Sequence, residues 1–150
     1  MGTLEPNRRI GDAEGATSSI TGKLKPKIVV VDYHKGNIRS VERALEDSGA
    51  DAVISDDSAV IGRADAVVLP GVGAFTDAME TIESLRLADP LRDAIAREVP
   101  FLGSCLGQHL LFEAGEEHAA GVELTRGLGI FPGVVRSMPR VDDEGRPKNI

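Results

Sequence analysis

Short, mainly apolar runs alternate along the chain with segments whose apolar residues recur at helical spacing, and this alternation constrains the fold most. Apolar runs of this length suit strands that are buried on both faces of a parallel sheet. We expect such strands at residues 28–31, 52–54, 66–69 and 100–103.

The segments between these runs predict helices. Ile38, Val41 and Leu45 recur at helical spacing, and Gly49 is expected to close this first helix as a cap. Further helices are expected from three apolar sets: Phe75, Met79, Ile82 and Leu85; Leu91 and Ile95, after a start near Pro90; and Leu106, Leu110 and Leu111, in a helix that frays at Gly115.

Strands that alternate with helices in this way predict βαβ units, and hence an α/β fold with a doubly wound, mostly parallel sheet. The order of the strands does not follow from the sequence. Beyond residue 120, glycine and proline interrupt short apolar runs, which favours hairpins or an extension of the sheet edge. We expect residues 1–26 to be a disordered extension and residues 27–150 to form one domain that is incomplete at its carboxyl end.

The charge balance limits the partners that we expect for the chain, and the single cysteine limits the compartment in which we expect it. With 17 basic and 24 acidic residues, the 150-residue chain carries a net charge of −7, and only 3% of its residues are aromatic. This composition argues against nucleic acid and an anionic membrane as partners. No apolar run approaches the roughly 20 residues of a membrane span. One cysteine excludes an internal disulfide, so we expect a cytoplasmic protein.

The strongest local signal is the segment at 103–107, in which Gly103 and Gly107 flank Cys105. A Gly-x-nucleophile-x-Gly segment between a strand and a helix is typical of a nucleophile elbow. The sharp turn leaves no room for a side chain two residues before or two residues after the nucleophile. It also lifts the nucleophile side chain above the edge of the sheet. The N-terminus of the following helix then favours the thiolate form of Cys105.

A thiolate that attacks a carbonyl group also needs donors for the resulting oxyanion. The N–H of Leu106, directly after the nucleophile, is one candidate. Gly71, Val72 and Gly73 follow the expected third strand, and their backbone can approach a ligand closely. We therefore predict that this loop supplies the second donor.

The chain resembles a class I glutamine amidotransferase domain and, more narrowly, the glutaminase subunit of imidazole glycerol phosphate synthase. The elbow is specific only to the class, whereas the Asp-Tyr…Gly-Asn and Pro-Gly-Val-Gly-Ala-Phe segments point to the subfamily. Four matching segments, which together cover nearly all of residues 27–150, lie at residues 31–41, 69–79, 100–113 and 127–135.

The resemblance implies a reaction in which Cys105 attacks the side-chain amide of L-glutamine and releases ammonia through a glutamyl thioester. Ammonia then passes to a barrel-shaped cyclase subunit, which makes imidazole glycerol phosphate and an aminoimidazole carboxamide ribotide in histidine biosynthesis. Tyr33, Gly36 and Asn37 lie in the segment that faces the cyclase in this family. We expect no cofactor and no metal ion.

Two departures from the family bear on catalysis. The class usually has Gln four residues after the nucleophile, in contact with glutamine, and here that residue is His109. Gln108 lies one residue earlier, a rotation of about 100° on a helix, so we expect His109 to supply part of the contact. The catalytic His and Glu of the family lie beyond residue 150, and we therefore expect this chain alone to be weakly active or inactive.

Three alternatives stay open at this point. The chain could be a non-catalytic remnant that binds a cyclase, or another amidotransferase subunit of the anthranilate or aminodeoxychorismate type. It could also be a different cysteine enzyme on a related sheet, with a reactive thiol that does not depend on glutamine.

Overall fold

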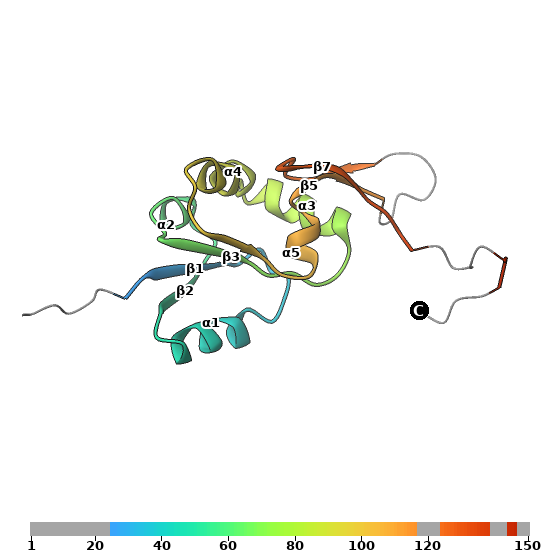
Figure 1. The fold of residues 1–150 in the computed structure, drawn as a ribbon. Helices are drawn as coiled ribbons and strands as arrows, with labels where there is room; N and C mark the ends of the chain where they lie inside the picture. Colours follow the sequence, from blue (N-terminus) through green and yellow to red (C-terminus); the bar gives the residue numbers. More distant parts are fainter. Residues whose placement is uncertain (1–24, 117–123, 139–143, 147–150) are drawn as a thin grey trace, which may run out of the picture.

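A computed structural model describes residues 25–116, 124–138 and 144–146. Helices and strands alternate through most of these residues (Figure 1). In chain order they are β1 (Lys27–Val31), α1 (Ile38–Asp47), β2 (Asp51–Ser55), α2 (Ser58–Ile61), β3 (Ala66–Leu69), α3 (Phe75–Ser84), α4 (Ala88–Ala96), β4 (Phe101–Gly103), α5 (Leu106–His109), β5 (Phe112–Gly115), β6 (Thr125–Arg126) and β7 (Phe131–Val135).

The main sheet contains the four strands that the apolar runs predicted. All neighbouring pairs are parallel, and the strand order is β2-β1-β3-β4. In register, Val29 of β1 lies between Val53 of β2 and Val67 of β3. The parallel arrangement brings the carboxyl ends of β1, β3 and β4 to one edge of the sheet, where the candidate site lies.

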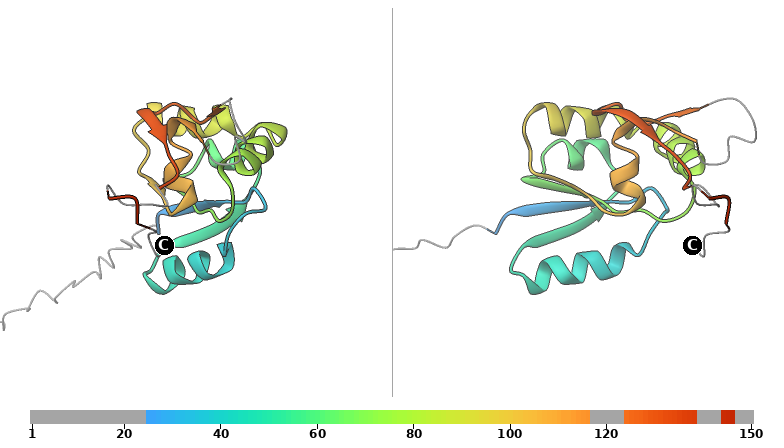
Figure 2. Two further views of the ribbon diagram at one scale, coloured as in Figure 1. Left: turned by 90° about the vertical axis from the view of Figure 1, so that its right-hand side faces the viewer. Right: turned by 45° about the vertical axis from the view of Figure 1, so that its right-hand side comes forward.

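Helices cover both faces of this sheet, so the predicted doubly wound α/β architecture is confirmed (Figures 1 and 2). α1 lies on one face, and α2, α3 and α4 lie on the other. The hydrophobic core sits beneath these three helices, whereas α1 contributes no fully buried residue. The largest fully buried side chains include those of Tyr33, Phe75, Ile61, Leu69, Ile82, Leu87 and Leu91.

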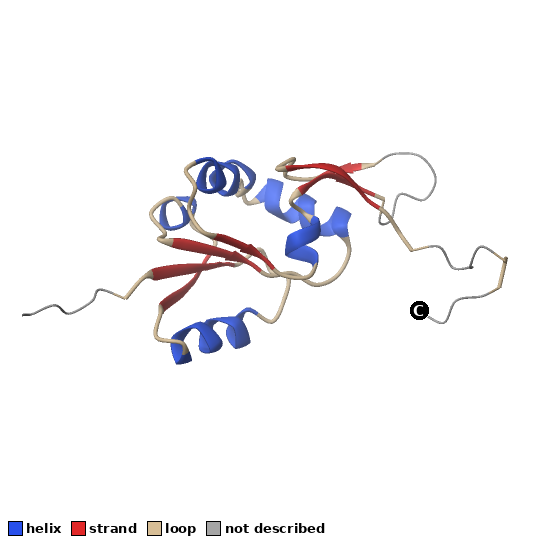
Figure 3. Ribbon diagram, in the orientation of Figure 1, coloured by secondary structure: helices blue, strands red, loops and turns tan. Residues whose placement is uncertain are grey.

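The prediction of a helix from Leu106 that frays at Gly115 is wrong. α5 ends at His109, and the chain continues as strand β5 of a second, three-stranded sheet of order β6-β5-β7 (Figure 3). The reason is long-range pairing. The carbonyl oxygens of Leu110 and Leu111 accept hydrogen bonds from the N–H groups of Leu128 and Ile130, each at 2.8 Å, and are not available to a longer helix.

Beyond residue 120 we expected hairpins or an extension of the sheet edge. The described strands there, β6 and β7, belong to this second sheet. β6 pairs with β5 antiparallel, and β7 pairs with β5 parallel. These strands therefore form a separate small sheet and do not extend the edge of the main one.

Two local details differ from expectation. Pro90 is the third residue of α4 and not its first. No helical hydrogen bond is lost there, because the first N–H groups of a helix have no partner within it. Helix α2 was not predicted; it is only one turn long, and the Asp57 carboxylate caps it by accepting from Ala59 N–H.

The predicted glycine cap of α1 is confirmed. Gly49 follows the last helical turn with a φ of +94°, its N–H donates to the Glu46 carbonyl oxygen at 2.9 Å, and Ala50 N–H donates to the Leu45 carbonyl oxygen at 3.1 Å.

One sequence-based expectation falls outside the described residues. The predicted disordered extension lies, up to residue 24, in the part of the chain that the structure does not describe.

Candidate active site

The predicted sharp turn between a strand and a helix is present at Cys105, between β4 and α5. Cys105 is the N-cap of α5, with a φ of +54° and a ψ of −120°, and its side chain is exposed. A residue with a Cβ rarely adopts this conformation, which costs on the order of 1–3 kcal/mol and persists only where the surroundings impose it. The elbow, residues 103–107, therefore holds a single accessible thiol in a strained position.

The surroundings that impose this conformation are backbone groups packed against the two flanking glycines. A Cβ on Gly107 would overlap the carbonyl oxygen of Leu69, at the end of β3, and a Cβ on Gly103 would lie 2.8 Å from the Cα of Gln108. The N–H of Ser104 donates to the same Leu69 carbonyl at 3.0 Å. The elbow is thus fixed to the end of the neighbouring strand, and the steric reason predicted for both glycines holds.

The segment after β3, here called the 70–73 loop, passes directly beside the first turn of α5. A Cβ on Gly71 would lie 2.9 Å from the backbone nitrogen of Gly107 and would overlap the hydroxyl oxygen of Tyr33. Pro70 and Gly71 are buried, whereas Val72 and Gly73 are exposed. The structure therefore brings Gly71 beside Leu106, since a Cβ on Gly71 would lie 3.1 Å from the Leu106 Cβ.

Leu106 is the first residue of α5, so its N–H has no partner within the helix. Its side chain is buried in the core, which orients the first turn of α5. In the described part of the chain no hydrogen bond from this N–H is present, and it stays a candidate oxyanion donor.

Tyr33, at the end of β1, is fully buried beneath the 70–73 loop, and its hydroxyl group donates to the Pro70 carbonyl oxygen at 2.8 Å. Burial raises the pKa of the Tyr33 phenol well above its usual value of 10, and the charge of the Cys105 thiolate raises it further. Sequence analysis placed Tyr33 only in a partner-facing segment, and no local pattern could have indicated its contact with Pro70, 37 residues away.

The rest of that segment is more accessible. Asn37 is exposed at the N-cap of α1, and Gly36 is half-buried with a φ of +115°. A Cβ on Gly36 would lie 3.5 Å from the backbone nitrogen of Gly71, so the segment rests against the 70–73 loop. Because Tyr33 is itself fully buried, any surface in this segment is formed by its neighbours.

His109 is the last residue of α5, the short helix that Cys105 caps, and it is exposed, as is Gln108. The backbone N–H of His109 donates to the Cys105 carbonyl oxygen at 3.4 Å. Within the described residues, no hydrogen bond joins the His109 imidazole to the Cys105 thiol, so nothing in this geometry makes it a general base. Its predicted contact with substrate remains a prediction.

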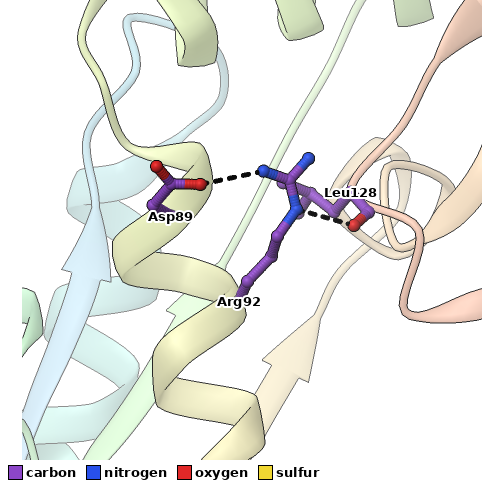
Figure 4. Close-up of polar contacts among 3 residues, drawn as sticks. All are labelled: Asp89, Arg92 and Leu128. Carbon is purple, nitrogen blue, oxygen red and sulfur yellow. Dashed lines mark hydrogen bonds and ion pairs between the residues drawn. The ribbon is translucent and has the colours of Figure 1, made fainter.

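A hollow of about 730 Å³ lies away from Cys105, where α3 and α4 meet β5 and β6. Charged side chains of these four elements border it, namely Glu83, Arg92, Glu113 and Arg126. Arg92 spans its wall: the guanidinium group donates to the Leu128 carbonyl oxygen at 2.9 Å and contacts the Asp89 carboxylate at 3.1 Å (Figure 4). Arg92 therefore ties the second sheet to α4.

The described residues contain neither a metal-binding cluster nor a membrane-spanning helix. No group of three or more histidine, cysteine, aspartate or glutamate side chains is arranged there to hold a metal ion. None of the described helices combines the length and the apolar character needed to cross a membrane.

Comparison with known proteins gives strong sequence similarity. The chain is 49% identical over 114 residues to "Imidazole glycerol phosphate synthase subunit HisH" of Aquifex aeolicus, covering 75% of this chain and 53% of that protein. It is 45% identical over 121 residues to the subunit of the same name from Salinibacter ruber, covering 81% and 53% of the two chains. No protein-family model matches the chain.

Solved structures share the fold. A crystal structure of a glutamine amidotransferase has a TM-score of 0.58 at 21% identity, covering 72% of this chain and 55% of that one. A putative peptidase E from Listeria monocytogenes also has a TM-score of 0.58, at 10% identity, covering 73% and 65%. At these identities the likeness concerns the fold alone. The chain spans about half the length of the curated relatives it matches.

Proposed function

We propose that this chain, which is homologous over most of its length to the HisH subunits, carries the nucleophile of a glutamine-hydrolysing site that supplies ammonia for histidine biosynthesis. The observation that carries the proposal is the elbow itself. An exposed thiol is held at positive φ, at the start of a helix, beside a glycine-rich loop that is buried at Gly71 and exposed at Val72 and Gly73. This arrangement suits attack on a carbonyl carbon.

The proposed reaction begins when the Cys105 thiolate adds to the carbon of the glutamine side-chain amide and the C=O electron pair moves onto oxygen. The N–H of Leu106 and an N–H of Val72 or Gly73 stabilise this oxyanion. Collapse breaks the C–N bond, and the nitrogen takes up a proton and leaves as ammonia. Water then cleaves the thioester, which releases glutamate and restores the thiol.

This sequence of steps needs an acid–base group that takes the thiol proton and protonates the departing nitrogen. Among the described residues no imidazole or carboxyl group hydrogen-bonds Cys105. The resemblance assigns this role to a His and a Glu that lie beyond residue 150 in the family, and we include them in the proposal. The exposed His109 side chain, one turn after Cys105, would contact the bound glutamine.

Chemical labelling of Cys105, the only cysteine in the chain, tests the proposal. We expect a diazoketone analogue of glutamine to label Cys105, and L-glutamine to protect it. D-Glutamine should protect much less, and Cys105→Ser should remove the label. Strong alkylation by iodoacetamide together with equal labelling in the presence and absence of L-glutamine would instead support a cysteine enzyme of another kind.

The partner in this proposal is a barrel-shaped cyclase subunit, in a cytoplasmic heterodimer. The partner rests on the names of the relatives, and the exposed Asn37 at the start of α1 offers a surface for it near the 70–73 loop. The location rests on the single cysteine. Asn37→Lys should weaken binding of a purified cyclase in titration calorimetry. Glu46→Lys, at the other end of the same helix, introduces the same side chain at another exposed position and should not.

A further inference from the structure

Tyr33 makes a specific contact with the backbone that leads into the 70–73 loop. The residue is fully buried, and its hydroxyl group donates to the Pro70 carbonyl oxygen at 2.8 Å. Pro70 is itself buried, so without this donor its carbonyl group would be left without a partner away from water. The hydrogen bond therefore selects one position for the first residue of the loop.

The same hydroxyl group also limits where the loop can go next. Gly71 lies between the Tyr33 hydroxyl group and the backbone nitrogen of Gly107, with no space for even a Cβ on that side. The 70–73 loop is thus held between Tyr33 below and the first turn of α5 above. Farther along the loop, Val72 and Gly73 are exposed, and among the described residues no side chain hydrogen-bonds them.

Tyr33 is suited to act as a permanent donor. Its burial and the nearby thiolate of Cys105 raise the pKa of the phenol, so the hydroxyl group keeps its proton throughout the neutral range. The hydroxyl is occupied by Pro70 and is covered by Gly71, so it does not reach a substrate. Its effect on chemistry must pass through the loop.

We propose that Tyr33 is a positioning residue of this site, whose hydroxyl group holds the 70–73 loop at the distance from Leu106 that two oxyanion donors require. The inference rests on the proposed function, because the loop matters only where an oxyanion forms. Tyr33→Phe keeps the ring and its packing and removes only the donor.

The test compares two reactions of Cys105 in the same 150-residue chain. Acylation by 4-nitrophenyl acetate passes through an oxyanion: the thiolate adds to the ester carbon, and 4-nitrophenolate leaves with its electron pair. Alkylation by iodoacetamide displaces iodide at a saturated carbon and forms no oxyanion. We expect Tyr33→Phe to slow acylation about 10-fold to 100-fold relative to alkylation, because a small displacement of an oxyanion donor has effects of this size.

A variant with a similar loss of stability separates an effect on the position of the 70–73 loop from a general loss of stability of the fold. Ile82→Val removes a methyl group from the buried face of α3, outside both the 70–73 loop and the elbow, and should change acylation and alkylation by the same small factor. Amide hydrogen exchange gives a second measurement. Tyr33→Phe should speed exchange at the N–H groups of residues 71–73 and leave the elbow unchanged, whereas equal rates in both variants and wild type would overturn the proposal.

The two hypotheses fail in different ways. An unchanged ratio of acylation to alkylation in Tyr33→Phe overturns the role of Tyr33, whatever the substrate. If the wild-type chain shows no preference for an activated γ-glutamyl aryl ester over the acetyl ester, the glutamine proposal is contradicted, while the effect of Tyr33→Phe on the acetyl ester can still be measured.

Discussion

The elbow and the 70–73 loop lie side by side at one edge of the main sheet, but they are held there in different ways. The elbow is fixed by backbone groups, since Gly107 packs against the Leu69 carbonyl and Ser104 N–H donates to it. The loop depends on one side chain, Tyr33, at its buried end and is exposed at Val72 and Gly73. The elbow is therefore held by its backbone, whereas we expect a single substitution at Tyr33 to move the 70–73 loop.

The largest expected effect comes from Gly107→Ala. The new methyl group would overlap the Leu69 carbonyl oxygen, and neither backbone segment can move without disturbing the sheet. We expect the free energy of unfolding to fall by about 3 kcal/mol, measured by urea denaturation. Gly62→Ala, where the nearest atom is 3.2 Å away and φ is not positive, is the matched control and should cost much less. Equal losses would mean that the elbow is not fixed by its backbone contacts.

A smaller loss is expected for Gly71→Ala, because part of the collision is with the end of a side chain. We expect a decrease in the free energy of unfolding of about 2 kcal/mol. In the Y33F background the hydroxyl group is gone, so the decrease should shrink by about 1 kcal/mol, a coupling that a double-mutant cycle measures. Strict additivity would show that Tyr33 and the loop are not in contact in solution.

The strain at Cys105 predicts that glycine is more stabilising than alanine at this position, which is the reverse of their order within a helix. Cys105→Ala keeps a Cβ at positive φ, whereas Cys105→Gly removes it, so the glycine variant should be the more stable by about 1 kcal/mol in thermal or urea denaturation. On α1, Ala44→Gly should show the usual order and lose about 1 kcal/mol. The same order at both positions would mean that the elbow carries no strain.

The smallest effect concerns pH. Because the pKa of Tyr33 is higher in the folded chain than its usual value of 10, its contribution to stability is complete below about pH 10 and is lost as the pH rises from there. The difference in unfolding free energy between wild type and Tyr33→Phe should therefore shrink by roughly 0.4 kcal/mol at pH 10. Tyr33 is the only tyrosine, so tyrosinate absorbance follows it directly. Ionisation of the folded chain near pH 10 would contradict the buried hydrogen bond.

Sequence reasoning succeeded where the information is local. The strand that ends at Val31 and the strand–helix turn at Cys105 were predicted because apolar periodicity and flanking glycines report backbone conformation over a few residues. It failed at Leu110 and Leu111, whose spacing fits a helix as well as a strand. There the outcome was decided by carbonyl groups that pair with residues 128–131.

For the candidate site, the sequence alone determined the sharp turn at Cys105, the two glycines that this turn requires and the glycine-rich loop expected to face it. Only the tertiary structure decided that this loop lies against Gly107, that Tyr33 is buried beneath it, and that α5 is a single turn. The physical reason is distance along the chain: Tyr33 and Pro70 are 37 residues apart, and their hydrogen bond exists only because β1 and β3 are neighbours in the sheet.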